Sequence, residues 1–454
     1  MKKFGSTYIF AILVLAIGVY TYFFEFKKAE EEKLKETEGI KLLRDFSQEQ
    51  ITSIRWQKGT TDVEMQKKDG LWRLLQPLDA EADKYTMESV LTTLTTEKED
   101  ILKLDDPKGV DPKSFGFAAG SGFIEIKTSG ATKRFIISDK KTFDGRQYHM
   151  KVDGNNEIYL VSTAFGELLE KPVKELRSKE ILGEILPKQF TVQVDGKPEA
   201  TFEKFGEEWK NVPNKDLKLD PKAVGDWIAA LKYVKAHDFL TENATDADKK
   251  KYGLDKPNLK VKILEPKKSI EFIASNPKDQ KIYLLTNQKP IIYEVTTAMM
   301  TPIQKTISDF RDKKIPFTFD ESNVTQVQID KPGLKVTLDK AKDHWKVSAG
   351  GDKKDADTAT LNSLVTKLRD ISVDKFLLPQ DVVKGLTPPS QKLILKDQTG
   401  KTILELALGE KFVEGPDQFI YAKTNLIKEN FVVKASKIDE LNVDRVLKSD
   451  GKAP

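Results

Sequence analysis

The chain has 454 residues, 39% of them hydrophobic and 32% charged, a composition typical of folded globular domains and not of a disordered chain. Its 75 Lys and Arg nearly balance its 71 Asp and Glu, and the two signs are interspersed. A nucleic-acid-binding surface needs clustered cations, so that class of protein is disfavoured. The lack of cysteine excludes disulfides, thiolate nucleophiles, lipid attachment to an N-terminal cysteine and zinc sites built on sulfur.

The first predicted element is an apolar run over residues 4–24, which are 21 consecutive positions without a charge. As a helix rising ~1.5 Å per residue, the run would span about 30 Å, the thickness of the hydrocarbon core of a bilayer. Lys2 and Lys3 precede it, whereas the lysines that follow it are soon balanced by Glu30–Glu32. Because positive flanks stay in the cytoplasm, this pattern predicts a cytoplasmic N-terminus and an extracytoplasmic remainder.

A cleaved signal peptide is the alternative interpretation of this run. Its apolar core is usually shorter, ~7–15 residues, and a cleavage site of small residues follows it. Here the run ends in the sequence YFFEF (residues 22–26), which contains no such site. We therefore predict an uncleaved transmembrane signal anchor over residues 1–26 and a charged stalk over residues 27–46.

The rest of the chain repeats one pattern three times. Trp72, Trp209 and Trp345 mark equivalent points, since they are separated by 209 − 72 = 137 and 345 − 209 = 136 positions. A repeat of this length is domain-sized. The spacing predicts three tandem repeat domains, over residues 47–183, 184–316 and 317–454.

Each copy is predicted to begin with strands and to continue into a helix. Apolar residues first alternate with a period of two, which indicates half-buried strands. An aspartate 11 or 12 positions after the Trp then caps a helix with apolar residues at i, i+3, i+4 and i+7. The alternating strand residues are Ile51, Ile54 and Trp56 in the first copy, Phe190, Val192 and Val194 in the second, and Val324, Val327 and Ile329 in the third. The capping aspartates are Asp83, Asp220 and Asp357. The apolar helix residues are Met87, Val90, Leu91 and Leu94 in the first copy, Val224, Trp227, Ile228 and Leu231 in the second, and Leu361, Leu364, Val365 and Leu368 in the third.

The second half of each copy is predicted to be a glycine turn, four strands and a short helix. The glycine is expected to supply a backbone conformation that other residues avoid, while its apolar neighbour fills the core. The turns are Phe115-Gly116-Phe117, Tyr252-Gly253-Leu254 and Lys384-Gly385-Leu386, and the next strands carry Ile124 and Ile126, Val261 and Ile263, and Leu393 and Leu395 inward. The later strands are FIISD, YHMKV and IYLVS; IEFIAS, KIYLLT and IIYEVT; ILELALG, FIYAKT and NFVVKA. The helices are expected over residues 165–177, 299–311 and 436–445.

An arginine stands at the end of each closing helix, namely Arg177, Arg311 and Arg445, at 134-residue steps (311 − 177 = 134 and 445 − 311 = 134). An arginine there is most simply a surface residue that complements the helix dipole. Grouped strands followed by helices predict an α+β fold with antiparallel sheets, in three tandem repeats that follow one transmembrane helix.

No residue is predicted to be catalytic, cofactor-binding or metal-binding, and no cofactor is expected. His149, His237 and His344 occupy non-equivalent positions without ligand spacing, and the three aspartates lack a second acid or histidine that would favour catalysis over capping. The sequence GFAAGSG (residues 116–122) lacks the Lys-Ser/Thr of a phosphate loop, and the loop at residues 153–156 lacks the acids of a calcium loop. The Trp triplet could stack on sugars, but packing in a core or between domains is the favoured interpretation.

The repeated motifs resemble those of the DUF4340 family of bacterial proteins. The resemblance is carried by WRLLQP (residues 72–77), ADKYTMESVLTTL (82–94), YGLDKP (252–257) and IYLV (158–161), and it covers essentially everything after Ser47 as well as the anchor. The third copy departs from the pattern, because Lys384 replaces the aromatic residue. The resemblance implies a membrane-anchored extracytoplasmic protein of the kind encoded beside ABC-type export permeases and gliding-motility subunits, with no established catalytic residue.

The function expected from these observations is non-catalytic. The protein would be a single-pass protein of the cytoplasmic membrane, held by residues 4–24, whose periplasmic part interacts with or assists an envelope complex such as an ABC-type permease. A ligand-binding module for envelope glycans or a transported solute is the main alternative. An enzyme of unrecognised type is a third, which would need a cleft with convergent acids of perturbed pKa.

Overall fold

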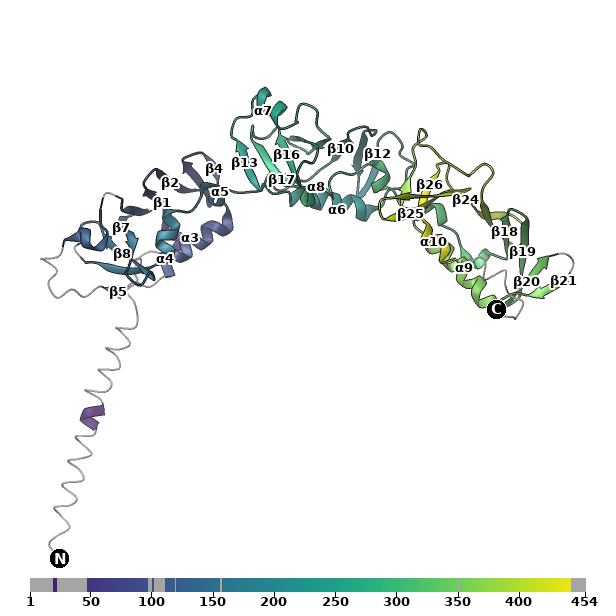
Figure 1. The fold of residues 1–454 in the computed structure, drawn as a ribbon, viewed down its shortest axis with the longest axis horizontal. Helices are drawn as coiled ribbons and strands as arrows, with labels where there is room; N and C mark the ends of the chain where they lie inside the picture. The colour runs from purple at the N-terminus through teal and green to yellow at the C-terminus, as the bar shows by residue number, and fades with distance from the viewer. Residues whose placement is uncertain are drawn as a thin grey trace, which may run out of the picture. The chain divides into compact units, whose positions relative to one another are not determined.

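The computed structural model describes residues 19–22, 47–96, 100–101, 111–118, 120–155, 157–349 and 352–441 (Figure 1). The predicted anchor and stalk lie outside the described residues, apart from residues 19–22. Among the described helices, none combines the length and the apolar character needed to cross a membrane. The chain divides into two compact units, Met1–Lys179 and Glu180–Pro454.

The first unit is built around one nine-stranded sheet with the order β4-β3-β2-β1-β6-β7-β8-β9-β5. β1 lies inside the sheet, because β2 pairs on one side of it and β6 on the other. The strands are β1 (Ile51–Lys58), β2 (Thr61–Lys68), β3 (Leu71–Gln76), β4 (Ala80–Glu81), β5 (Asp100–Ile101), β6 (Gly122–Thr128), β7 (Thr132–Lys141), β8 (Gln147–Val152) and β9 (Tyr159–Ser162), and the helices are η2 (Gln48–Gln50), α3 (Lys84–Thr96), η3 (Pro112–Phe115), α4 (Thr163–Leu169) and α5 (Val173–Leu176).

The second unit holds two further sheets, and the first of them has the order β12-β11-β10-β14-β15-β16-β17-β13. Its strands are β10 (Gln189–Val194), β11 (Ala200–Phe205), β12 (Glu208–Asn211), β13 (Asp238–Thr241), β14 (Leu259–Leu264), β15 (Ser269–Ala274), β16 (Lys281–Thr286) and β17 (Ile292–Thr296). Its helices are α6 (Pro221–Lys232), α7 (Asp246–Lys251), α8 (Thr297–Met300) and η4 (Ile307–Phe310).

The other sheet of this unit has the order β21-β20-β19-β18-β23-β24-β25-β26-β22. Its strands are β18 (Gln326–Lys331), β19 (Leu334–Ala341), β20 (His344–Ala349), β21 (Asp352–Asp355), β22 (Lys375–Phe376), β23 (Gln391–Lys396), β24 (Thr402–Glu414), β25 (Asp417–Thr424) and β26 (Phe431–Lys434). The helices around it are η5 (Ile315–Phe317), η6 (Glu321–Asn323), α9 (Thr358–Asp370) and α10 (Ala435–Asp439).

Eight strands of each sheet share one topology and one register, which confirms the prediction of a triplicated antiparallel α+β fold, and the first and third sheets add a ninth strand, β4 or β21, at one end. Every strand pair in the described residues is antiparallel. In each repeat the first strand faces the strand that follows the glycine turn, with the predicted inward residues opposite one another. These pairs are Ile54 and Ile126, Phe190 and Ile263, and Val327 and Leu395.

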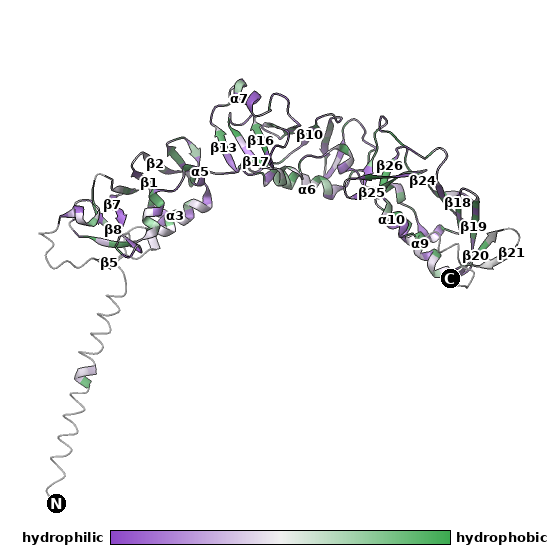
Figure 2. Cartoon of the chain, in the orientation of Figure 1, coloured by the Kyte–Doolittle hydropathy of each residue, from purple (hydrophilic) through white to green (hydrophobic). Residues whose placement is uncertain are grey.

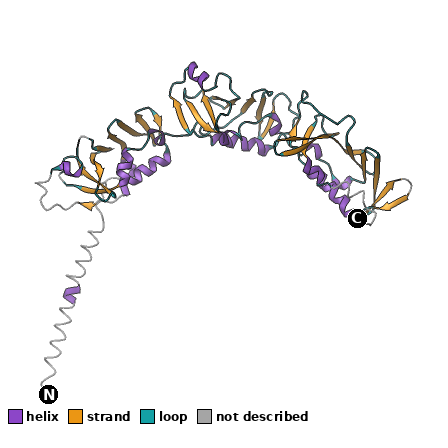
Figure 3. Cartoon of the chain, viewed as in Figure 1, coloured by secondary structure: helices purple, strands orange, loops and turns teal. Residues whose placement is uncertain are grey.

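One face of each sheet is covered by the longest helix of its repeat, α3, α6 or α9 (Figure 3). The predicted apolar stripes face the core, where all their residues are buried except Ile228, which is half-buried. Figure 2 shows hydrophilic and hydrophobic residues side by side within single strands and helices, as expected for elements with one buried face. Each repeat therefore has its own core between sheet and helix.

The three equivalent aspartates cap these helices as predicted. A side-chain oxygen of Asp83 accepts a hydrogen bond from the backbone N–H of Thr86 at 2.8 Å, and Asp220 accepts one from Lys222 at 2.9 Å. Asp357 accepts one from the N–H of Thr360 at 3.1 Å. These bonds satisfy N–H groups that a helix start leaves without partners.

The predicted glycine turns adopt the left-handed backbone conformation in all three repeats, with φ of +79° at Gly116, +68° at Gly253 and +72° at Gly385. The residue after the glycine is buried in the first two repeats, as Phe117 and Leu254, and half-buried in the third. The turns therefore lie where the chain enters the second half of each sheet, and their apolar residues are outside the core clusters of the described residues.

The prediction of one continuous closing helix per repeat is wrong. Residues 165–177 form two short helices, α4 and α5, because Pro172 lacks a backbone N–H and starts the second helix in an extended conformation. Residues 299–311 are similarly divided between α8 and η4, with Pro302 in the intervening turn. The third closing helix is α10, and the end of its predicted range lies outside the described residues.

The prediction that the closing arginines lie on the surface is also wrong for the two that the structure describes. Arg177 is 5% exposed, and only 12% of the side chain of Arg311 is accessible. Both follow the last helical residue in an extended conformation and form a β-bridge, to Ala82 and Leu219 respectively, just before the capping aspartate. The arginines thus join the end of a repeat to the start of its main helix. Arg445 lies outside the described residues.

Candidate functional site

The residues that recur in all three repeats have structural partners within their own repeats. Each capping aspartate lies at the start of a different helix, within a different repeat. Across the described part of the chain, no group of three or more His, Asp or Glu side chains is placed to hold a metal ion. The repeated positions therefore offer no constellation of acids or ligands in the described residues.

The three tryptophans occupy one equivalent place, on the third strand of each repeat. Each lies opposite a lysine of the neighbouring strand, in the pairs Lys67–Trp72, Lys204–Trp209 and Lys340–Trp345. Trp72 and Trp209 are half-buried against their cores, whereas Trp345 is 1% exposed and donates a hydrogen bond from Nε1 to Asn362 at 3.0 Å. These environments match packing in a core.

The glycine-rich loop of the first repeat is built as a turn. The hydroxyl of Ser121 accepts a hydrogen bond from the N–H of Ala118 and donates one to the carbonyl of Gly116. A Cβ atom at Gly116 would lie 2.7 Å from Oδ1 of Asp139, so a carboxylate faces this turn. A negative side chain at this place opposes phosphate binding, which depends on free N–H groups and cations.

His149 of the first repeat is held in a packed environment. Its ring lies edge-on to Phe115, with 5.1 Å between centroids, and its backbone N–H donates to the hydroxyl of Ser138. Within the described residues its buried Nδ1 has no hydrogen-bond partner. Burial lowers the pKa of His149 below its ordinary value of 6.5, although a hydrogen bond with the backbone of Phe115 acts in the opposite direction.

This burial predicts a specific sensitivity to acid. Because His149 has a lower pKa folded than unfolded, the unfolded chain binds more protons once the pH falls below about 6.5. The free energy of unfolding should therefore decline from pH 7.5 to pH 5.5, and part of this decline should be due to His149. Thermal unfolding of the full-length protein and of His149→Phe, with pH 8 as the reference, measures this share. An equal decline in both proteins would refute it.

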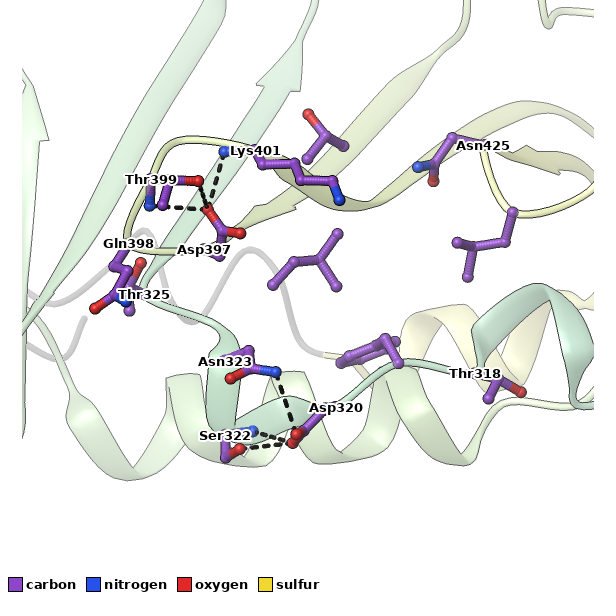
Figure 4. A pocket seen from close by; sticks show the side chains of 14 residues that line it. Thr318, Asp320, Ser322, Asn323, Thr325, Asp397, Gln398, Thr399, Lys401 and Asn425 are labelled. Carbon is purple, nitrogen blue, oxygen red and sulfur yellow. Dashed lines mark hydrogen bonds between the residues drawn. The ribbon is translucent and has the colours of Figure 1, made fainter.

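A polar cavity of about 630 Å³ lies in the third repeat (Figure 4). Three segments line it: residues 318–325, which lead into β18, the loop from β23 to β24, and the residues that follow β25. Within this cavity the side chain of Lys401 extends toward Asn425 (Figure 4). Cavities of this size accommodate small molecules, although most ligand pockets are more apolar.

Both carboxylates of this cavity are engaged in their own turns. Asp397 accepts hydrogen bonds from the N–H and hydroxyl of Thr399 at 2.8 and 2.7 Å and from the N–H of Lys401 at 3.0 Å (Figure 4). Asp320 accepts bonds from the N–H and hydroxyl of Ser322 at 2.9 and 2.7 Å. The hydroxyl bonds are the largest cause that lowers the pKa of each carboxyl, Thr399 for Asp397 and Ser322 for Asp320.

The lowered pKa values of these two carboxyls bear on whether the cavity is suited to acid–base chemistry. A general acid or base works best with a pKa near the working pH, and both carboxyls shift away from neutrality. The cavity therefore presents two fixed negative charges, an ammonium group and amides, a set suited to hydrogen bonding with a polar molecule. Sequence reasoning did not find this cavity. The sequences around Asp320 and Asp397 are typical of Asx turns, so each turn is predictable. The pairing of β18 with β23, which brings the two turns together, is long-range and is not predictable from local sequence.

Comparison with known protein families finds two matches to one family model, and they begin one repeat length apart. The sequence matches the family model described as "Domain of unknown function (DUF4340)" over residues 72–203 and 209–392. The chain belongs to the DUF4340 family. Each DUF4340 match begins at the third strand of a sheet, at Trp72 on β3 or Trp209 on β12, and ends in the next sheet. No curated protein matches the chain.

Proposed function

We propose that this DUF4340 protein is a non-catalytic interaction or accessory protein, anchored in the cytoplasmic membrane with its repeats on the extracytoplasmic side. The observation that carries the proposal is the use of the recurring residues. The aspartates cap helices, the glycines turn the chain, and the stripes fill three cores. Because the repeated residues stabilise the fold, the surface of the repeats is the part suited to binding a partner.

The sequence supports the location. The uncharged run over residues 4–24 is long enough for a membrane helix, and the lysines before it favour a cytoplasmic N-terminus. The resemblance to proteins encoded beside export permeases makes an ABC-type permease or another envelope complex the partner class to test first.

Crosslinking in membranes tests this proposal. A photo-crosslinking residue would replace an exposed side chain of one repeat at a time, at Tyr85, Tyr233 or Val413, which are 74%, 73% and 71% exposed. We expect at least one site to capture the same membrane protein in independent preparations, identified by mass spectrometry, and only after irradiation. Recovery of unrelated abundant proteins from every site would contradict the proposal.

Ligand binding is the second candidate function, and the polar cavity of the third repeat favours it. A ligand that binds the folded state must raise the melting temperature. A thermal-shift screen of the full-length protein against cell-wall fragments and small polar solutes would show such a rise. Replacing Lys401 with Ala should abolish the rise for a ligand of this cavity, whereas Lys411→Ala, outside the cavity lining, should not.

A further inference from the structure

The polar cavity of the third repeat has an apolar inner wall. Phe319 and Ile403 both line the cavity and pack against the core of this repeat. Leu426, which is 36% exposed, lines the cavity as well. A bound molecule can therefore place an apolar group against these side chains while its polar groups meet the charged residues around them.

The charged residues of the cavity carry opposite signs and lie apart. Figure 4 shows the side chain of Lys401 directed away from Asp397 and toward Asn425, while Asp320 lies on the segment across the cavity. Within the described residues none of these three charges forms an ion pair. The hydroxyl of Thr399 is the largest cause that lowers the pKa of Asp397, and the nearby charge of Lys401 adds to it. The ammonium group is therefore near the carboxylate without being in contact with it.

These groups also keep hydrogen-bonding capacity that the fold does not use. The turn bonds of Asp397 all go to its Oδ1, which leaves Oδ2 without a partner among the described residues. The Oδ1 of Asn425 accepts a hydrogen bond from the N–H of Glu405 at 2.7 Å, and its amide N–H groups have no partner within the described chain. The ammonium group of Lys401 adds three donors. The cavity thus offers an open acceptor at Asp397 and open donors at Lys401 and Asn425.

The charges restrict the kind of molecule that fits. The carboxyls of Asp320 and Asp397 have lowered pKa values, chiefly through the hydroxyls of Ser322 and Thr399, so both are ionised at neutral pH. Two carboxylates repel an anion, and a purely cationic ligand leaves Lys401 unpaired. A neutral ligand displaces water from all three charges without neutralising any of them, which costs free energy. A ligand that carries both signs neutralises both.

We infer that this cavity binds a small zwitterion, namely an α-amino acid or a dipeptide. Its ammonium group pairs with Asp397 and Asp320, and its carboxylate pairs with Lys401 and the amide of Asn425. Its apolar side chain lies against Phe319. The cavity volume of about 630 Å³ leaves room for the second residue of a dipeptide. The inference rests on ligand binding, the second candidate function, and specifies the chemical class of the ligand.

Titration of the full-length protein in detergent with charge-blocked ligands tests this inference. The probes are leucine and alanyl-leucine, each also in its N-acetylated form, which lacks the ammonium group, and as its amide, which lacks the carboxylate. Isothermal titration calorimetry should show saturable binding of at least one of the two zwitterions. Each of its blocked forms should bind about tenfold more weakly, because it loses a charged hydrogen bond. This comparison uses the unaltered protein, so it does not depend on whether a variant folds.

Two substitutions assign each charge of the ligand to its partner. In Lys401→Ala the zwitterion and its amide should bind equally, because the partner of the ligand carboxylate is gone. In Asp397→Asn the difference between the zwitterion and its acetylated form should fall, since only Asp320 remains, while the Asn oxygen can still accept the turn bonds. Lys411→Ala is the matched control. Lys411 lies outside the cavity lining and pairs with Asp439 at 3.0 Å, so its loss should leave both preferences unchanged.

Three results would overturn the assignment. They are the absence of saturable binding by either zwitterion, binding of a blocked form as tightly as its zwitterion, and a Lys401→Ala variant that still prefers the zwitterion to its amide. Ligand binding itself is decided separately by the thermal-shift screen. A neutral solute that raises the melting temperature of the unaltered protein but not that of Lys401→Ala would exclude the zwitterion and retain ligand binding in this cavity.

Discussion

Gly385→Ala is expected to lower the free energy of unfolding of the third repeat by about 3 kcal/mol. Gly385 has a φ of +72°, which costs a residue with a Cβ about 1–2 kcal/mol. That Cβ would also lie 2.6 Å from the backbone N of Glu410 and 3.1 Å from the carbonyl carbon of Gly409. Both contacts involve backbone of β24, so relief requires a shift of the strand, as in an overpacked core.

The equivalent glycine of the second repeat is the matched control. Gly253 has nearly the same φ, +68°, but its nearest neighbour would be Cβ of Ser275 at 3.8 Å, an ordinary contact. Gly253→Ala should therefore cost only the backbone contribution of about 1–2 kcal/mol. Hydrogen exchange of the full-length protein, read by mass spectrometry over β24 and over β15, compares the two. Equal loss of protection in the two variants would show that the backbone contact with β24 is not decisive.

This pair of glycines illustrates what could be read from the sequence. The equivalence of Gly253 and Gly385, and their left-handed conformation, were predictable because the turn is local. The close approach to Glu410 was not, since it depends on how β24 bends past the turn, where its pairing with β25 shifts register between Leu408 and Lys411.

In the rest of the fold, too, local features were predictable from the sequence and long-range pairings were not. Strands and main helices were predictable because their burial is periodic along the chain. The edge strands β5, β13 and β22 were not, because they are two to four residues long and exist through pairing with distant strands, as in Asp100 opposite Leu160.

The arginines show how a local rule can fail. An arginine at a helix end was expected to remain solvated, but the partners that bury Arg311 come from another repeat, 429 − 311 = 118 positions away in the case of Glu429. The segments that line the polar cavity are also far apart in the sequence, since Asp320 and Asp397 are separated by 397 − 320 = 77 positions. Local patterns therefore predicted the repeats well and the contacts of the unrepeated sites poorly.

Arg311 is the second place where a single substitution should have a large effect, because it connects the second and third repeats within their common unit. Its guanidinium lies 3.7 Å from the ring centroid of Phe376, and its Nη2 lies 3.2 Å from a carboxylate oxygen of Glu429. Burial lowers the pKa of Arg311, while Glu429 acts to raise it. The junction is extended by the N–H of Phe376, which donates to the hydroxyl of Ser308 at 2.9 Å.

Arg311→Ala should lower the free energy of unfolding of this unit by about 3 kcal/mol. The substitution removes a desolvated cation–π contact worth about 2 kcal/mol and a charged hydrogen bond worth about 1.5–3 kcal/mol. The partial exposure of Glu429 weakens this hydrogen bond. Arg369→Ala is the control, since Arg369 forms an exposed ion pair with Glu321 at 3.1 Å, worth at most about 1 kcal/mol. Urea unfolding of the full-length protein measures both, and hydrogen exchange should show loss of protection at β22 and η4 only for Arg311→Ala. If the two substitutions lower the free energy of unfolding equally, burial of the guanidinium does not stabilise the junction. The second and third repeats would then be held together by their backbone contacts instead.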